Sequence, residues 1–219
     1  MDTNPLEKFL AVREAPEALQ QPPPAKPSVL RRIVSMCLTA LTVIAILFGV
    51  AGAQVVSSRP PQLENWTRQT FHGLSLDSPV SSFHMEDLRS KLPAEVQEMM
   101  LAFDSCFGSD KSESLTVGLT RGIYSPEITA DLDGGVQGVV ALSAEKLGEK
   151  DPKYSPTRVI VSGLEGRRAI YRPANGGQVE MVLAGRKNKL WMVVVAYTNA
   201  ASAQDAQRVL NSIAINPDE

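Results

Sequence analysis

The sequence predicts an α+β protein, in which an α/β/α sandwich on a mostly antiparallel sheet follows a single transmembrane helix. Three observations predict this class. Residues 33–53 contain no charged side chain, the last part of the chain contains consecutive strand-like runs separated by turn residues, and segments 133–150 and 202–215 carry apolar residues at helical spacing. The sheet therefore has helices available to cover both of its faces.

The apolar run at residues 33–53 has the length of a membrane span. As a helix, its 21 residues would measure about 31 Å, close to the ~30 Å hydrocarbon core of a bilayer. The run is longer than the apolar region of an ordinary signal peptide, although it ends in Ala51-Gly52-Ala53, an A-x-A pattern that a signal peptidase could cleave. We expect the run to be retained, and the mass of the mature protein would reveal cleavage.

The charges around this run predict its orientation. Basic residues crowd its N-terminal flank, at Lys26, Arg31 and Arg32. The positive-inside rule then places residues 1–32 in the cytoplasm, as a proline-rich tail that we expect to be mostly disordered. Residues 54–65 are interpreted as a linker. Residues 66–219 are interpreted as a domain on the periplasmic, or extracytoplasmic, side of the inner membrane.

One face of the predicted membrane helix carries small residues. Ala45, Gly49 and Ala53 lie four residues apart, a spacing that allows two membrane helices to approach closely. This face predicts a weak homodimer through the membrane helix. The alternative is that the three residues reflect only the high frequency of Ala and Gly in such helices.

Composition limits the partners and the covalent chemistry. The chain carries 22 Lys and Arg residues against 24 Asp and Glu residues, so it offers no general attraction to a phosphate backbone, and nucleic acid is not an expected partner. Cys37 lies in the apolar run and Cys106 in the domain, which excludes a disulfide within the domain. We expect Cys106 to be a small buried apolar residue rather than an interchain bridge.

The first half of the domain is predicted to contain two strands and two helices. Residues 70–80 and 115–124 are interpreted as strands. Residues 92–107 are interpreted as a helix, because apolar side chains recur at helical spacing at Val96, Met99, Met100 and Phe103. Residues 133–150 are interpreted as a second helix, with Asp133 as its N-terminal cap.

The second half carries the clearest pattern. Strand-like runs occupy residues 157–164, 166–173, 177–185 and 189–198, and predict an antiparallel meander. In the last run both alternating sets of side chains are apolar, so this strand should be covered on both sides. A closing helix is expected over residues 202–215.

Several segments together resemble a known superfamily. They are "FHGLSLDSP" at residues 71–79, "VSGLEGRRAIYR" at 161–172, and "GRKNKLWMVVVAYT" at 185–198 leading into "AQRVLNSIAI". This pattern is similar to that of PsbP-like domains, which include an extrinsic photosystem II subunit, a Ran-binding nuclear import factor and many bacterial envelope proteins. The resemblance implies the sandwich fold and a protein-binding role without chemistry. Its motifs are structural and identify no functional residue.

The residues themselves also give little sign of catalysis. His72 and His84 belong to no metal-binding or catalytic motif, and Asp131 to Gly135 begins like a calcium loop but lacks the later ligands. No cofactor or metal is predicted, and the protein is not expected to be an enzyme. The weakest alternative is an enzyme whose active-site residues lie far apart in the sequence and form no recognisable motif.

A basic patch is the candidate binding site. It would consist of residues on adjacent strand ends and one turn: Arg167, Arg168, Arg172, Arg186, Lys187 and Lys189. Such a patch suits an acidic protein or anionic lipid. Alternatively, these side chains form a solvated edge that discourages aggregation between strands.

Two functions remain open at this point. The first is a single-pass membrane protein that presents a non-enzymatic protein-binding domain outside the cytoplasmic membrane. Its partners would be the bilayer and an unidentified protein. The second is an envelope module for a hydrophobic ligand or lipid, with a cavity lined by Met99, Met100 and Phe103 between sheet and helices. A closed, packed core at these residues would count against the second.

Overall fold

The computed structural model describes most of the predicted domain. The described residues are 66–87, 89–91, 94–146, 148–174 and 176–219. The predictions for the tail at 1–32, the membrane span at 33–53 with its small-residue face, and the linker at 54–65 lie outside them. Among the residues described, no helix is long and apolar enough to cross a membrane.

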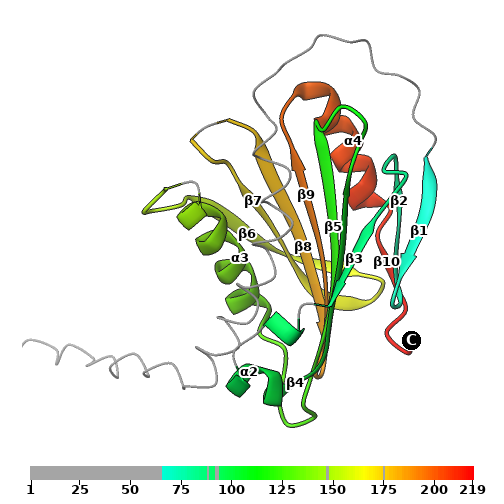
Figure 1. Cartoon of the computed structure of the whole chain (residues 1–219), viewed down its shortest axis with the longest axis vertical. Coiled ribbons are helices and arrows are strands. Elements are labelled where there is room, and N and C mark those ends of the chain that lie inside the picture. Colours follow the sequence, from blue (N-terminus) through cyan, green and yellow to red (C-terminus); the bar gives the residue numbers. More distant parts are fainter. Residues whose placement is uncertain (1–65, 88, 92–93, 147, 175) are drawn as a thin grey trace, which may run out of the picture.

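A seven-stranded antiparallel sheet forms the centre of the domain, with the strand order β3-β4-β5-β9-β8-β7-β6 (Figure 1). Its strands are β3 (His84–Asp87), β4 (Met100–Ser109), β5 (Leu115–Tyr124), β6 (Tyr154–Val161), β7 (Leu164–Tyr171), β8 (Gln178–Arg186) and β9 (Lys189–Tyr197). The predicted meander is confirmed as β6 to β9, and the strand predicted at 115–124 is confirmed as β5. The α+β class and the mostly antiparallel sheet are therefore confirmed.

Different elements cover the two faces of this sheet (Figure 1). Helix α3 (Leu132–Lys146) packs on one, which we call the α3 face. Helix α4 (Ala200–Asn211) packs on the other, the α4 face, beside a three-stranded sheet. That smaller sheet contains β1 (Thr67–Phe71), β2 (Leu74–Ser78) and β10 (Ala214–Ile215), and two short helices, η2 (Arg89–Lys91) and α2 (Ala94–Met99), precede β4.

Strand β9 contributes to the apolar cores on both faces. Leu190, Met192 and Val194 belong to the core under α3. Trp191, Val193 and Val195 belong to the core under α4. Because successive side chains of a strand point to opposite faces, a strand that is apolar at every position requires two covers. The prediction that this strand is covered on both sides is confirmed.

The single strand predicted at residues 70–80 is wrong. The chain reverses at His72 and Gly73, and β1 and β2 pair as a hairpin. Both turn residues have positive φ, 46° and 78°. Gly73 is required here, because a Cβ atom would lie 2.6 Å from the carbonyl oxygen of Asn216. The alternating apolar pattern concealed the turn because it continues through it.

The helix predicted at residues 92–107 is also wrong over most of its length. Helix α2 ends at Met99, and β4 begins at Met100. A register shift between Met100 and Ala102 in the pairing with β5 lets Met100 and Phe103, three residues apart, both enter the core under α3. The irregular strand therefore imitates helical spacing.

The ends of the two long helices differ from the prediction. Helix α3 begins at Leu132, so Asp133 lies within its first turn, and the carboxylate of Asp131 accepts a hydrogen bond from the Gly134 N–H at 3.0 Å instead. Helix α4 ends at Asn211, and residues 214–215 form β10 rather than a last helical turn. Asn199 is its N-terminal cap.

Candidate functional site

The six basic residues of the predicted patch lie in separate places. Arg167 and Arg168 are neighbours in β7 and therefore point to opposite faces of the sheet. Arg172 is exposed and follows β7, at the end of the sheet where the chain passes to β8. The remaining three, Arg186, Lys187 and Lys189, lie at the opposite end, where β8 turns into β9. We call these three residues the basic turn.

Arg167 is part of the contact between β7 and helix α3. Its Nε donates to Asp133 at 2.6 Å and its Nη1 donates to Glu165 at 2.9 Å, while only 9% of its side chain is exposed. These hydrogen bonds raise the pKa of Arg167 further above its usual range. Its charge is compensated within the domain, so it is poorly placed to attract a partner.

Arg168 lies on the other face, in a buried polar group that we call the Glu180 cluster. Its Nη2 donates to Glu180 Oε2 at 2.7 Å, and the carboxylate is 1% exposed. The other oxygen of Glu180 accepts hydrogen bonds from Gln178 at 2.8 Å, Tyr197 at 2.7 Å and Gln207 of α4 at 2.8 Å. The cluster therefore connects β7, β8 and β9 to α4.

The electrostatics of this cluster favour an ionised Glu180. Burial alone would raise the pKa of Glu180, but the hydrogen bonds from Arg168, Tyr197 and Gln207 outweigh it and hold the pKa below its usual value. Burial and the neighbouring carboxylate raise the pKa of Tyr197, which stays a neutral donor. All the surrounding donors are directed at one carboxylate, which indicates a structural role. A glutamate within the otherwise apolar run of β8 is the sequence signal that indicates this cluster.

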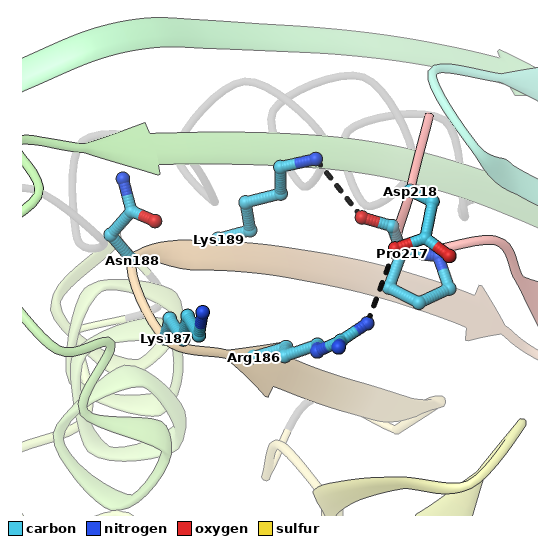
Figure 2. Close-up of a pocket in the computed structure, with 6 residues that line it drawn as sticks. All are labelled: Arg186, Lys187, Asn188, Lys189, Pro217 and Asp218. Carbon is cyan, nitrogen blue, oxygen red and sulfur yellow. Dashed lines mark hydrogen bonds and ion pairs between the residues drawn. The ribbon is translucent and has the colours of Figure 1, made fainter.

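The basic turn borders a shallow hollow with a volume of about 200 Å³. Figure 2 shows its lining, which consists of Arg186, Lys187, Asn188, Lys189, Pro217 and Asp218. Lys189 Nζ donates to the Pro217 carbonyl oxygen at 3.0 Å, and Arg186 Nη1 lies 3.3 Å from an Asp218 carboxylate oxygen. The Arg186 and Asp218 side chains are 52% and 85% exposed, so water reaches this ion pair.

Hydrogen bonds to a neighbouring loop hold the basic turn in place. The Tyr124 N–H donates to the Asn188 carbonyl oxygen at 2.8 Å, and the Ala130 N–H donates to the Lys187 carbonyl oxygen at 3.0 Å. The Asn188 side-chain amide donates to the Tyr124 carbonyl oxygen at 2.6 Å. The two residues that connect β8 and β9, Lys187 and Asn188, are thus both hydrogen-bonded to the chain segment that includes Tyr124 and Ala130.

A second charged group lies beside the basic turn on the α4 face. Arg121 Nη2 lies 2.6 Å from Asp104 Oδ2, and His72 Nε2 lies 3.7 Å from the same oxygen. Within the described residues, the buried Nε of Arg121 has no hydrogen-bond partner. The indole of Trp191 fixes the hairpin turn by donating to the His72 carbonyl oxygen at 3.1 Å. Sequence reasoning missed this group because its members come from three distant segments.

Cys106 is buried in the core under α4, as predicted. Burial raises the pKa of its thiol to about 12, so the thiol stays protonated at neutral pH. This argues against a nucleophilic role in combination with a histidine. Among the described residues, no group of three or more His, Cys, Asp or Glu side chains is arranged to hold a metal ion.

The residues predicted to line a hydrophobic cavity are packed instead. Met100 and Phe103 are 0% and 1% exposed, within the core under α3, and Met99 packs against that core. A Cβ atom added at Gly122 would already lie 3.4 Å from the Met100 methyl carbon and 3.7 Å from the Phe103 ring. This packing counts against a ligand pocket at these residues.

Solved structures similar to this chain include PsbP from Synechocystis sp. PCC 6803, which is 9% identical; the match covers 74% of this chain and 99% of that chain, with a TM-score of 0.48. LpqN of Mycobacterium tuberculosis, which is involved in cell envelope biogenesis, is 12% identical, with 70% and 91% covered and a TM-score of 0.34. PA94 of Pseudomonas aeruginosa, of unknown function, is 12% identical, with 65% and 94% covered and a TM-score of 0.27. No family model matches the chain, and no curated protein matches it.

Proposed function

We propose that this protein is a single-pass membrane protein that presents residues 66–219 on the outer side of the cytoplasmic membrane, as a non-enzymatic protein-binding domain. The observation that carries this proposal is the placement of the basic turn relative to the point where the chain enters the domain. The chain enters at Trp66, which packs on Arg208 of α4 with 3.9 Å between the guanidinium and the ring centroid. From there β1 runs toward the end of the central sheet that carries the basic turn, where the Trp191 indole donates to the His72 carbonyl oxygen (Figure 1).

This placement suits a domain that is anchored through the apolar run at 33–53. The basic turn then points away from the anchor, where it can meet another protein. Two other residues of the predicted patch are engaged internally: Arg167 with Asp133, and Arg168 with Glu180. The protonated thiol of Cys106 and the internal pairing of these charges support a binding role rather than catalysis.

The anchor is tested on the full-length protein in a bacterial host. We expect the protein to remain with the membrane fraction after alkaline carbonate extraction, and the domain to become sensitive to protease in spheroplasts. Intact mass should show retention of the first 53 residues. A soluble mature protein that lacks them would overturn the anchored topology.

The binding role is tested separately by photo-crosslinking in cells. A photoreactive amino acid is placed at Lys187 in the basic turn, at Ile160 of β6 and at Met85 of β3; the last two side chains are 73% and 65% exposed. We expect a discrete protein adduct from at least one position, and none when the photoreactive group is placed at the buried Val140. Failure to obtain an adduct at all three exposed positions would contradict the proposal of a protein-binding domain.

A further inference from the structure

We propose that the basic turn binds an acidic segment of a partner protein, at the place that the chain's own residues Asn216–Glu219 occupy in this structure. This inference rests on the proposed binding function and specifies its surface and the chemistry of its partner. Residues 216–219 then act as an intramolecular competitor. Two observations support it: the solvent-accessible charge of the turn, and the nature of the segment that now lies on it.

The charge of the basic turn is largely available. Lys187 makes no ion pair within the described residues. Arg186 is half exposed, and its ion pair with Asp218 is accessible to solvent. Exposed pairs of this kind contribute at most about 1 kcal/mol, so this contact is easily exchanged for another carboxylate. By contrast, the other strong cations of the two core faces, Arg167 and Arg168, are held by buried or bidentate contacts.

The basic turn has a backbone like that of the other two-residue hairpins of the domain. Lys187 is the first of the two residues that connect β8 and β9, and its φ is 56°. The equivalent residues of the β1–β2 and β6–β7 hairpins, His72 and Ser162, have φ values of 46° and 50°. The backbone therefore does not single out Lys187, and the inference rests on the charge of the turn and on the segment that lies on it.

The segment that lies on the turn shows which chemistry the turn accepts. It reads Asn-Pro-Asp-Glu and carries two carboxylate side chains. Its backbone is tied to the β1–β2 hairpin by the Asn216 N–H, which donates to the Gly73 carbonyl oxygen at 2.7 Å. A carbonyl oxygen of Pro217 and a carboxylate of Asp218 meet Lys189 and Arg186 (Figure 2). An acidic peptide from another protein offers the same groups.

Protein is favoured over lipid as the source of the acidic groups. The chain enters at the start of β1, and the far end of β1 lies near the basic turn, where the Trp191 indole donates to the His72 carbonyl oxygen (Figure 1). In the proposed anchored topology, this placement favours a neighbouring protein over the bilayer to which the domain is attached.

The test uses the full-length protein in nanodiscs of phosphatidylcholine and a fluorescent peptide that repeats the sequence Asn-Pro-Asp-Glu. A peptide with Asn and Gln in place of Asp and Glu is the uncharged control. We expect the acidic peptide to bind, and the K187N and R186Q variants each to weaken binding about fivefold. Neutralising the competitor with D218N and E219Q together should tighten binding about threefold. R158Q, which removes an exposed charge from β6, is the matched control and should leave binding unchanged.

The K187N variant also separates binding from folding. Asparagine tolerates a positive φ better than lysine does, so this variant should unfold at the same temperature as the wild type or higher. Equal peptide binding by the wild type and K187N, or no binding of the acidic peptide, would overturn the inference. Unchanged binding in the D218N/E219Q variant would overturn the role of residues 216–219.

A nanodisc arm distinguishes the lipid alternative. The protein in its phosphatidylcholine nanodisc is mixed with separate, empty phosphatidylglycerol nanodiscs. If it attaches to them and K187N does not, and if the acidic peptide fails to bind, the turn binds anionic lipid and the proposal is overturned. A protein adduct from Ile160 or Met85 in cells, together with failure of the peptide assay, would refute this inference while leaving the binding domain intact.

Discussion

The α3 face and the α4 face of the central sheet are closed by different means. On the α3 face one helix packs on an apolar core, and the charged contact of Arg167 with Asp133 lies at its margin, where Asp133 is 63% exposed. On the α4 face a helix and a small sheet lie together, and charged groups enter the interface. Glu180 is 1% exposed there, and the Arg121–Asp104 pair lies under the β1–β2 hairpin turn.

This difference suggests what the buried polar groups do. Apolar contacts are not directional, so one helix over one core can settle by close packing alone. Two covers that share a face must also be placed relative to each other. Gln207 binds α4 to Glu180, and the hydroxyl of Ser212 accepts from the Asp77 N–H at 2.8 Å, joining the end of α4 to β2. We infer that these directional contacts position the two covers on the α4 face.

The largest effect is expected from R168M on the α4 face. This variant leaves the carboxylate of Glu180 buried without its cationic partner, which should lower the free energy of unfolding by about 3 kcal/mol at neutral pH. In the E180Q background the same substitution should cost only about 1 kcal/mol, because no buried charge is left behind. Urea unfolding of the four proteins gives the coupling energy. Equal costs in the two backgrounds would refute the buried-charge explanation.

A smaller effect is expected from D133A on the α3 face. Arg167 loses two hydrogen bonds but keeps those to Glu165 and to the Gly166 carbonyl oxygen. The expected cost is about 1.5 kcal/mol, reduced from that of a buried pair because Asp133 is largely exposed to solvent. The same urea series measures it. A cost as large as that of R168M would show that the two faces do not differ in the way described.

Acid should act mainly through the α4 face. The folded-state pKa of Glu180 lies below its usual value of 4.5, so its ionised form stabilises the fold above that pH. This stabilisation is lost as the pH falls from 4.5 through the folded-state pKa. Over that interval the difference in stability between wild type and E180Q should narrow by at most about 1.4 kcal/mol per pH unit. Urea unfolding of both proteins at a series of pH values measures this difference. A difference between wild type and E180Q that stays constant below pH 4.5 would contradict the prediction.

The sequence predicted most strands because their signals are local. The meander from β6 to β9 has a turn signal at each connection, and the two apolar sets of β9 predict two covers. The errors arose where two local patterns coincide. At His72 an alternating pattern runs through a turn, and at Met100 a bulged strand places apolar residues three apart, as a helix would. Only pairing with distant strands distinguishes these cases.

The candidate site was predicted in part for the same reason. The basic turn is local, so its three residues could be grouped from the sequence. Arg167 and Arg168 were grouped with it, although neighbours in a strand point to opposite faces, a rule that was available from the sequence. The overlap of residues 216–219 with the turn depends on how the end of the chain packs after β10, and no local pattern predicts that.

The smallest effects are expected at the residues that immediately precede the two covering helices, which offer a matched pair. Asn199 accepts from the Ser202 N–H at 2.9 Å at the start of α4, and Asp131 accepts from the Gly134 N–H at 3.0 Å before α3. N199A and D131A should each lower the free energy of unfolding by about 1 kcal/mol, because each removes one cap. Urea unfolding measures the totals, and amide exchange in the first turn of each helix shows where the loss occurs. Similar losses in the free energy of unfolding would show that the helix caps do not distinguish the two faces. The difference would then lie in the buried contacts of the α4 face, at Glu180 and its partners. If N199A costs more than twice as much as D131A, the position of α4 depends on its cap, and the Glu180 cluster is not what holds that helix in place.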